Sequence, residues 1–338
     1  MYNTTGLAFT EAKLKNITLN TRFVRSAFEL FDSTPDAHVS DYEFTVYEEL
    51  AKHPIGLIIT AHTCVSPEGR SNDFQNAIWS DEYIPDQSRI ASLITAGSGK
   101  CKSALQIGHG GMKAENHNGG RRVLTPDNMT KEDIKSVREA FVSAAVRAKK
   151  CGFDSVELHG AHMYLLSQFF YPQYNHRSDE YGGKAENRIR IAAEILTSIK
   201  ETVGDDFPVF LKLNGDNIEE PEQYFEDVVR ACEILYDNGL EALELSGYHS
   251  SPRGEPKEPF FSENAARLVS LTKLPIIQVG GIRTLEQAEE ILSRGITAVS
   301  MARPFICQPD LIEHWANGER AKCISCGRCG GNRGRCIL

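Results

Sequence analysis

Long apolar runs and a surplus of positive charge are both missing from this chain of 338 residues. No stretch approaches the roughly 18 apolar residues that a membrane-spanning helix needs, and Met1 to Thr10 contain neither the basic region nor the apolar run of a secretory signal peptide. The 37 Lys and Arg residues are outnumbered by 46 Asp and Glu residues, which gives a net charge of −9. A nucleic-acid backbone is therefore not an expected partner, and we expect a cytoplasmic protein with no membrane partner.

Apolar residues make up 41% of the chain, which is ample for a hydrophobic core. The nine cysteines are an odd number for a chain of cytoplasmic character. This favours free thiols or metal ligands over a disulfide framework. The length fits one large barrel or two average domains, and no low-complexity linker divides the chain.

Strand-like and helix-like patterns alternate along the whole chain, which predicts a parallel sheet. The predicted strands are Phe23–Ala27, Gly56–Thr60, Ser103–Ile107, Ser155–His159, Val209–Leu213, Ala242–Ser246, Ile276–Val279 and Ala298–Ala302. The predicted helices are Asp41–Lys52, Asp81–Ala96, Lys131–Cys151, Lys184–Val203, Pro221–Asn238, Ser262–Thr272, Leu285–Arg294 and Asp310–Asn317. Eight such pairs favour a closed (β/α)8 TIM barrel over its rival, a doubly wound sheet.

Two segments flank the predicted barrel. Residues Leu7–Leu19, with the turn residues Asn16 and Asn20, predict a hairpin that plugs the bottom of the barrel. We divide the chain into a barrel over residues 1–320 and a cysteine-rich tail over residues 321–338.

The most informative stretch runs from Val156 to Leu166. It starts as a buried strand and then presents His159, His162 and Tyr164 within six positions. All three side chains carry protons, and imidazoles titrate near neutral pH. A single histidine there is most simply a polar loop residue. Three together favour an active site, because barrels build their active sites at the C-terminal ends of their strands.

This stretch resembles the Old Yellow Enzyme family of FMN-dependent ene-reductases. The matching segments are HGAHMYLLSQFF (residues 159–170), NHRSDEYGG (175–183) and ENR (186–188). The resemblance implies that His159 and His162 hold an oxygen of the substrate and that Tyr164 donates a proton to the alkene. It also implies FMN as cofactor, NAD(P)H as electron donor and a small-molecule alkene as substrate. Family members often associate, so a homo-oligomer stays open.

The resemblance also assigns residues to the flavin ring. Ser26 and Ala27 are small residues at the tip of the first strand, where a ring can approach the backbone, and Thr60 ends the second strand. Gln106 offers the donors and the acceptor that the pyrimidine edge requires. Where the family has a Thr or Cys that tunes the redox potential, this chain has Phe28 or Glu29, and an exposed loop acid is an equally good interpretation of Glu29.

Lys212 lies inside an apolar strand, where burial of its charge is costly without compensation. We expect the reduced flavin to supply that compensation. Gly280 and Gly281 precede a helix and form an anion nest, and Ala302 and Arg303 at the end of the eighth strand place a guanidinium beside it. This pair of loops predicts a phosphorylated ligand in many barrels. Combined with the other residues, it points to FMN.

Three further segments are less defined. Arg121 and Arg122, in the loop after the third strand, are either contacts for a substrate anion or solvated side chains. The loop Ser250–Pro259 is expected to border the substrate. The tail carries Cys323, Cys326, Cys329 and Cys336, a spacing that resembles the iron–sulfur segment of the 2,4-dienoyl-CoA and enoate reductase branch of the family. An iron–sulfur cluster, zinc and a metal-free remnant are all compatible with it.

These observations predict an NAD(P)H-dependent flavin oxidoreductase that reduces electron-poor alkenes such as α,β-unsaturated carbonyls. The alternative is an FMN and iron–sulfur component that passes electrons to a partner protein. A non-enzymatic binder of phosphorylated ligands leaves His159, His162 and Tyr164 without a purpose.

Overall fold

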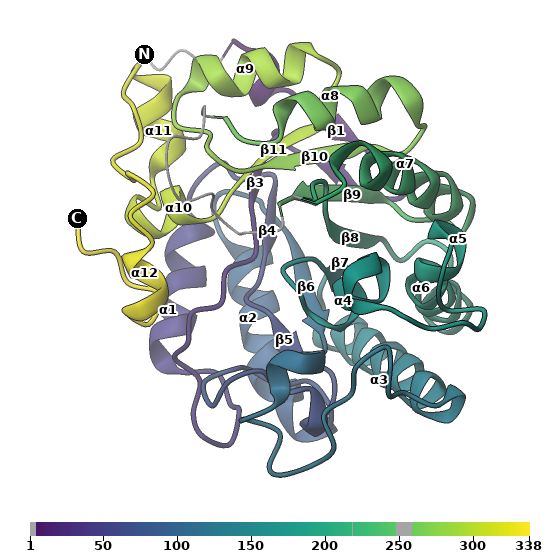
Figure 1. The fold of residues 1–338 in the computed structure, drawn as a ribbon. Coiled ribbons are helices and arrows are strands. Elements are labelled where there is room, and N and C mark those ends of the chain that lie inside the picture. The colour runs from purple at the N-terminus through teal and green to yellow at the C-terminus, as the bar shows by residue number, and fades with distance from the viewer. Residues whose placement is uncertain (1–4, 218, 248–258) are drawn as a thin grey trace.

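The computed structural model describes residues 5–217, 219–247 and 259–338. Except for Pro259, the loop that we expected to border the substrate therefore lies outside the described residues. Within these ranges, eight parallel strands close into a barrel that is surrounded by helices (Figure 1). The strands are β3 (Phe23–Arg25), β4 (Leu57–Ile59), β6 (Lys102–Gly108), β7 (Ser155–Gly160), β8 (Val209–Asn214), β9 (Ala242–Ser246), β10 (Ile276–Val279) and β11 (Ala298–Met301). The predicted TIM barrel is confirmed.

The outer helices follow their strands in the predicted order. They are α1 (Asp41–Leu50), α2 (Ile84–Ala96), α3 (Lys131–Cys151), α6 (Arg190–Val203), α7 (Pro221–Asp237), α8 (Ser262–Leu271), α9 (Leu285–Ser293) and α11 (Leu311–Ala316). Two helix starts differ from prediction by three residues or more, and the other helix ends differ by at most two. Pro85 occupies the first turn of α2, so residues Asp81–Tyr83 form a separate 3-10 turn. A turn at Ile189 separates the short helix α5 (Ala185–Arg188) from α6. No helix in the described ranges is both long and apolar enough to cross a membrane.

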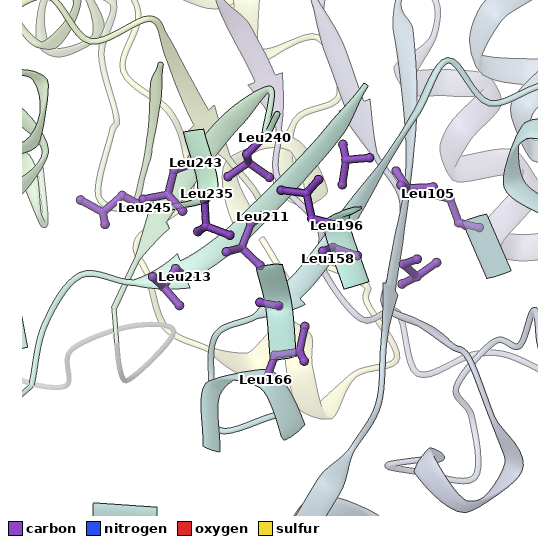
Figure 2. Packing of buried hydrophobic residues seen from close by; sticks show 14 of the residues in the cluster. Leu105, Leu158, Leu166, Leu196, Leu211, Leu213, Leu235, Leu240, Leu243 and Leu245 are labelled. Carbon is purple, nitrogen blue, oxygen red and sulfur yellow. The ribbon is translucent and has the colours of Figure 1, made fainter. Parts of the chain in front are cut away.

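Side chains that alternate along each strand face two different layers. The outward residues Leu105, Leu158, Leu211, Leu213, Leu243 and Leu245 belong to one buried cluster with Leu196 of α6 and Leu235 of α7 (Figure 2). Burying each leucine contributes about 1.5–3 kcal/mol. The inward residues form a second apolar cluster at the bottom of the barrel, which contains Val24, Leu57, Ile59, Ala104, Phe210, Ala242, Ile277 and Ala298.

The predicted hairpin covers this bottom layer. It pairs β1 (Ala12–Lys13) with β2 (Thr18–Leu19) in antiparallel register. Ala12, Ile17 and Leu19 are buried against the inward residues of the barrel. The next inward positions toward the opposite end are polar, because residues 26, 106, 212, 244 and 300 share the pleat of residues 24, 104, 210, 242 and 298. The barrel therefore has an apolar bottom and a polar layer at its C-terminal mouth.

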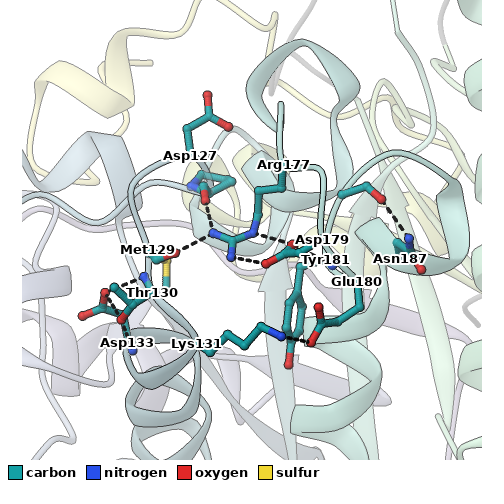
Figure 3. A network of polar contacts seen from close by, with 12 residues as sticks. Asp127, Met129, Thr130, Lys131, Asp133, Arg177, Asp179, Glu180, Tyr181 and Asn187 are labelled. Carbon is teal, nitrogen blue, oxygen red and sulfur yellow. Dashed lines mark hydrogen bonds and ion pairs between the residues drawn. The ribbon is translucent and has the colours of Figure 1, made fainter.

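The NHRSDEYGG segment braces the loop that follows β7 against the start of α3 (Figure 3). Arg177 donates two hydrogen bonds to Asp179, at 2.9 and 2.5 Å, and two to the carbonyls of Pro126 and Met129, both at 2.6 Å. The start of α3 itself carries a capping box between Thr130 and Asp133. This segment fixes the loop that follows His159 without reaching the barrel mouth.

Candidate active site

A cavity of about 1280 Å³ opens at the C-terminal mouth of the barrel. Its walls come from the ends of the strands, from the loops after them and from the C-terminal tail. Its lining includes, among the residues predicted to bind or react, Ser26, Ala27, Gln106, His159, His162, Tyr164, Lys212, Gly280, Gly281, Ala302 and Arg303. The volume exceeds the 300–1000 Å³ of a typical ligand pocket. It has room for a flavin together with a second planar molecule.

Lys212 of β8 forms the floor of the cavity. Its ammonium is 2.6 Å from Oε2 of Glu244 on β9 and donates a hydrogen bond of 2.6 Å to the hydroxyl of Ser26 on β3. The side chains of Lys212 and Glu244 are only 3% and 0% exposed. Glu244 also accepts a hydrogen bond of 2.5 Å from Ser300 of β11. We expected a reduced flavin to balance Lys212, but a buried carboxylate of the protein already does so.

Glu157 of β7 extends this buried group. Gln106 donates a hydrogen bond of 2.7 Å to Oε2 of Glu157, so the amide nitrogen of Gln106 faces that carboxyl. Burial, followed by the charge of Glu244, raises the pKa of Glu157 well above its usual range. This shift favours the neutral form of Glu157. The floor thus contains the ion pair of Lys212 and Glu244, with the carboxamide of Gln106 held against Glu157.

Four aromatic rings, from His62, His159, His162 and Tyr164, line another part of the cavity. The ring of Tyr164 lies 4.5 Å from that of His159 and 4.4 Å from that of His62, measured between centroids. His159 lies 4.8 Å from His62 and 5.2 Å from His162. The sequence thus placed three of these rings correctly beside one another. His62, which the sequence did not mark as a site residue, also lines the cavity.

The turn after β7 aims these rings inward. His162 and Met163 adopt left-handed backbone conformations, with φ of 57° and 61°, which are unusual for residues other than glycine. The amide of His162 donates to Oδ1 of Asn214 at 3.1 Å, and Nε2 of His162 is 2.9 Å from the hydroxyl of Ser246. These contacts to β8 and β9 hold the turn in its strained form, a feature that often marks functional sites.

The histidines are neutral imidazoles at neutral pH. Burial, followed by the neighbouring His62, lowers the pKa of His159 well below its usual range, and burial followed by the charge of Lys212 does the same for His162. Burial lowers the pKa of His62 to about 3. Burial also raises the pKa of Tyr164, so its hydroxyl keeps its proton. The wall therefore offers neutral hydrogen-bond donors rather than fixed charges.

The predicted phosphate end lies at another side of the cavity. Gly280 and Gly281 have φ of 108° and 72°, a succession that lets backbone amides converge on an anion. An added Cβ at Gly281 would stand 2.9 Å from the backbone nitrogen of Phe260, so neither conformation nor space permits a larger residue. Arg303 at the start of α10 (Arg303–Cys307) and the buried Arg283 line the cavity beside the glycines.

Some residues lie elsewhere than expected. Thr60 is buried behind the cavity wall, where its hydroxyl accepts a hydrogen bond of 3.3 Å from the amide of Gln106, and it does not line the cavity. Glu29 does line it, and burial, followed by the charge of Glu43, raises the pKa of its carboxyl well above the usual range. Glu29 is thus not an exposed loop acid, and burial favours its neutral form. Arg122 pairs with Asp133, and neither Arg121 nor Arg122 reaches the lining.

The cysteine-rich tail contributes one wall of the cavity through residues 324–332, which include α12 (Arg328–Gly331). Within the described ranges, no group of three or more His, Cys, Asp or Glu side chains is arranged to hold a metal ion. The predicted site of Cys323, Cys326, Cys329 and Cys336 is therefore not supported. Cys326 is exposed, whereas Cys323 and Cys329 are buried.

A polar cavity at the C-terminal mouth of a closed parallel barrel defines the class of TIM-barrel enzymes. A family model described as "NADH:flavin oxidoreductase / NADH oxidase family" matches residues 8–322. An NADPH dehydrogenase of Halalkalibacterium halodurans is 33% identical over 89% of this chain and 91% of its own. The chain belongs to the NADH:flavin oxidoreductase / NADH oxidase family, and it is an oxidoreductase.

Solved structures agree on the fold. An Old Yellow Enzyme homologue from Zymomonas mobilis is 23% identical, with a TM-score of 0.82 over 98% of this chain and 97% of its own. A 2-naphthoyl-CoA reductase in complex with 2-naphthoyl-CoA is 25% identical, with a TM-score of 0.82 over 94% of this chain. This chain spans only about half of that reductase, 53% of its length. The match to the 2,4-dienoyl-CoA and enoate reductase branch, which the tail suggested, is not confirmed.

Proposed function

We propose that this protein reduces electron-poor alkenes, such as α,β-unsaturated carbonyl compounds, with NAD(P)H as electron donor and FMN as cofactor. The observation that carries the proposal is that His159, His162 and Tyr164 line the same cavity as Lys212 and Gln106, with His159 beside Lys212 in the register of β7 and β8. Proton-donating groups thus share one cavity with a floor that suits a flavin. The names of the relatives agree: one is an NADPH dehydrogenase, and a morphinone reductase was solved with tetrahydroNAD.

The residues present fit FMN. We assign the phosphate to Gly280, Gly281 and Arg303, because consecutive left-handed glycines beside a guanidinium suit an anion. We assign the flavin ring to the floor of the cavity. There the carboxamide of Gln106 and the ammonium of Lys212 can form hydrogen bonds with polar edges of the ring. The small residues Ser26, Ala27 and Ala302 leave space beside the ring, and Thr60 supports it from behind through Gln106. When bound, FMN supplies the hydride chemistry that no side chain provides.

The protein then polarises and protonates the substrate. Neutral His159 and His162 donate hydrogen bonds to the activating oxygen of the alkene, where negative charge develops. His162 is oriented for this by Asn214 and Ser246. The raised pKa keeps the hydroxyl of Tyr164 protonated, so this group can donate its proton to the α carbon of the alkene.

Replacement of Tyr164 by Phe tests the proposal. We expect stopped-flow reoxidation of the reduced enzyme by 2-cyclohexenone to slow by about 10²-fold or more, the range for loss of a general acid. Reduction by NADPH should change far less, because Tyr164 serves only the alkene. Tyr236→Phe is the matched control, since Tyr236 is 43% exposed on α7. An unchanged reoxidation rate in Tyr164→Phe would exclude Tyr164 as the proton source, and a wild-type enzyme that reduces no activated alkene would refute the function.

A further inference from the structure

The cavity carries more positive charge than FMN accounts for. Among its described lining residues, the cationic side chains are Lys113, Lys212, Arg283, Arg303 and Arg328, whereas Glu29 is the one carboxylic acid. Burial raises the pKa of Glu29, which favours the neutral form of its carboxyl. Lys212 is balanced by Glu244, and the phosphate of FMN balances the arginine beside the glycines. Lys113 belongs to neither group.

Lys113 lies at the reactive end of the cavity. Its ammonium is 4.9 Å from the centroid of the Tyr164 ring. Its charge also contributes to the lowered pKa values of His159 and His162. No carboxylate in the described part of the chain forms an ion pair with it. A cation is thus held beside the group that protonates the substrate, without a counter-charge from the protein.

The backbone fixes Lys113 relative to Tyr164. Lys113 lies in a 3-10 turn (Gly111–Ala114), and Tyr164 immediately precedes α4 (Leu165–Phe170). Gln168 of α4 accepts a hydrogen bond of 3.2 Å from the amide of Met112 and donates one of 3.2 Å to the carbonyl of Gly110. Gly111 has φ of 59°, and a Cβ there would stand 2.5 Å from the amide of Gln168. The turn and α4 therefore form one unit.

We propose that Lys113 binds an anionic substituent of the substrate, so that the preferred alkene carries a carboxylate or a similar anion on the side of the carbon that Tyr164 protonates. This inference rests on the proposed alkene reduction and specifies its substrate class. Lys113 is exposed to water in the ligand-free protein, although partial burial lowers the pKa of its ammonium. A bound substrate excludes part of this water, so an ion pair with a substrate anion is worth more there than in bulk water. The same contact orients the alkene with its α carbon toward Tyr164.

Two substrates that differ by one charge test this inference. The probes are 2-cyclohexenone and (6-oxocyclohex-1-en-1-yl)acetate, which carries its carboxylate on the α-carbon side, and the quantity is the ratio of their KM values. For Lys113→Gln we expect the KM of the carboxylate to rise at least about fivefold more than the KM of the neutral enone. Lys113→Arg should restore most of the wild-type ratio, because it keeps the charge. Lys135→Gln is the control, since Lys135 lies on the outer surface of α3, where it pairs with Glu132 and Glu139.

The outcomes separate the two proposals. A change in the KM ratio that Lys113→Arg reverses supports the anion site. An equal rise in both KM values, or none, overturns the anion site and leaves alkene reduction intact. Failure of the wild-type enzyme to reduce either probe overturns both proposals.

Discussion

Lys212 shows how one buried charge is tolerated at the floor of the site. Glu244 lies 2.6 Å away and both side chains are almost fully buried, so neither can be solvated if the other is lost. The apolar neighbours Leu211 and Leu213 identified Lys212 as a buried lysine from the sequence alone. They did not identify Glu244 as its partner, because the pairing of Lys212 with Glu244 depends on the register between β8 and β9, in which residue 212 lies opposite residue 244.

This pair gives a prediction at the level of single residues. Glu244→Gln leaves Lys212 buried without a counter-charge, which should lower the free energy of unfolding by about 3–5 kcal/mol. Urea unfolding, followed by circular dichroism, measures the change. The double variant Lys212→Met/Glu244→Gln should recover much of the loss, because no unpaired cation remains.

The control is a surface pair, Glu222 with Arg267 at 2.8 Å, in which Glu222 is 76% exposed. Water solvates Arg267 when its partner is removed, so Glu222→Gln should alter stability only marginally. If Glu244→Gln proved as mild as Glu222→Gln, the floor of the cavity would be hydrated and our account of Lys212 would be wrong.

At the scale of elements, helix α1 connects to the site through a buried polar group. Glu43 of α1 accepts hydrogen bonds from Asn76, both at 2.8 Å, and from Tyr47 at 3.3 Å. Tyr47 in turn accepts a hydrogen bond of 2.7 Å from the amide of Ala61, just beyond β4. Burial raises the pKa of Glu43 from 4.5 to about 7. The helix thus holds the end of a barrel strand through a carboxyl that titrates near neutral pH.

The raised pKa predicts how stability depends on pH. Between pH 4.5 and 7 the folded protein keeps the proton of Glu43 while the unfolded chain loses it, so stability falls as the pH rises. The shift corresponds to about 3 kcal/mol. Glu43→Gln should therefore flatten the decline between pH 4.5 and 7.5 relative to wild type. Urea midpoints at several pH values provide the measurement, and parallel curves for the two proteins would contradict the assignment.

Elements were predicted best where a local pattern decides them. The eight strands and the helices α3 and α7 follow from periodicity, and the left-handed C-cap Gly152 ends α3 where expected. The short helix α10 was not predicted. Pro304 lies in its first turn and favours a helix start, but five residues are too few to show an apolar repeat. His62 and Lys113 were missed as site residues for a different reason. Each enters the cavity through contacts with segments distant in sequence, as with Gln75 at His62 and Gln168 beside Lys113.

At the scale of the whole molecule, the C-terminal tail closes the cavity that the barrel leaves open. Arg335 donates a hydrogen bond of 3.1 Å to Asp32, and its guanidinium stands 3.6 Å over the Tyr42 ring. Arg283 donates a hydrogen bond to the hydroxyl of Ser325. These contacts hold residues 324–332 against the mouth (Figure 1). The sequence suggested a metal site for this tail, whereas the structure gives it the role of a wall.

A chain that ends at residue 322 tests this role, because it keeps the barrel and loses the wall. We expect its Kd for FMN to rise at least tenfold, since the phosphate end beside Arg303 becomes open to water and loses Arg328. Quenching of FMN fluorescence measures the Kd, and circular dichroism checks that the barrel is folded. Arg335→Ala removes one contact of the tail and leaves the tail in place, so it should raise the Kd for FMN by a smaller factor than the truncation does. If the truncated chain is folded and binds FMN as tightly as the full chain, the tail is packing against the barrel without enclosing its ligand, and the cofactor is held by strands and loops alone.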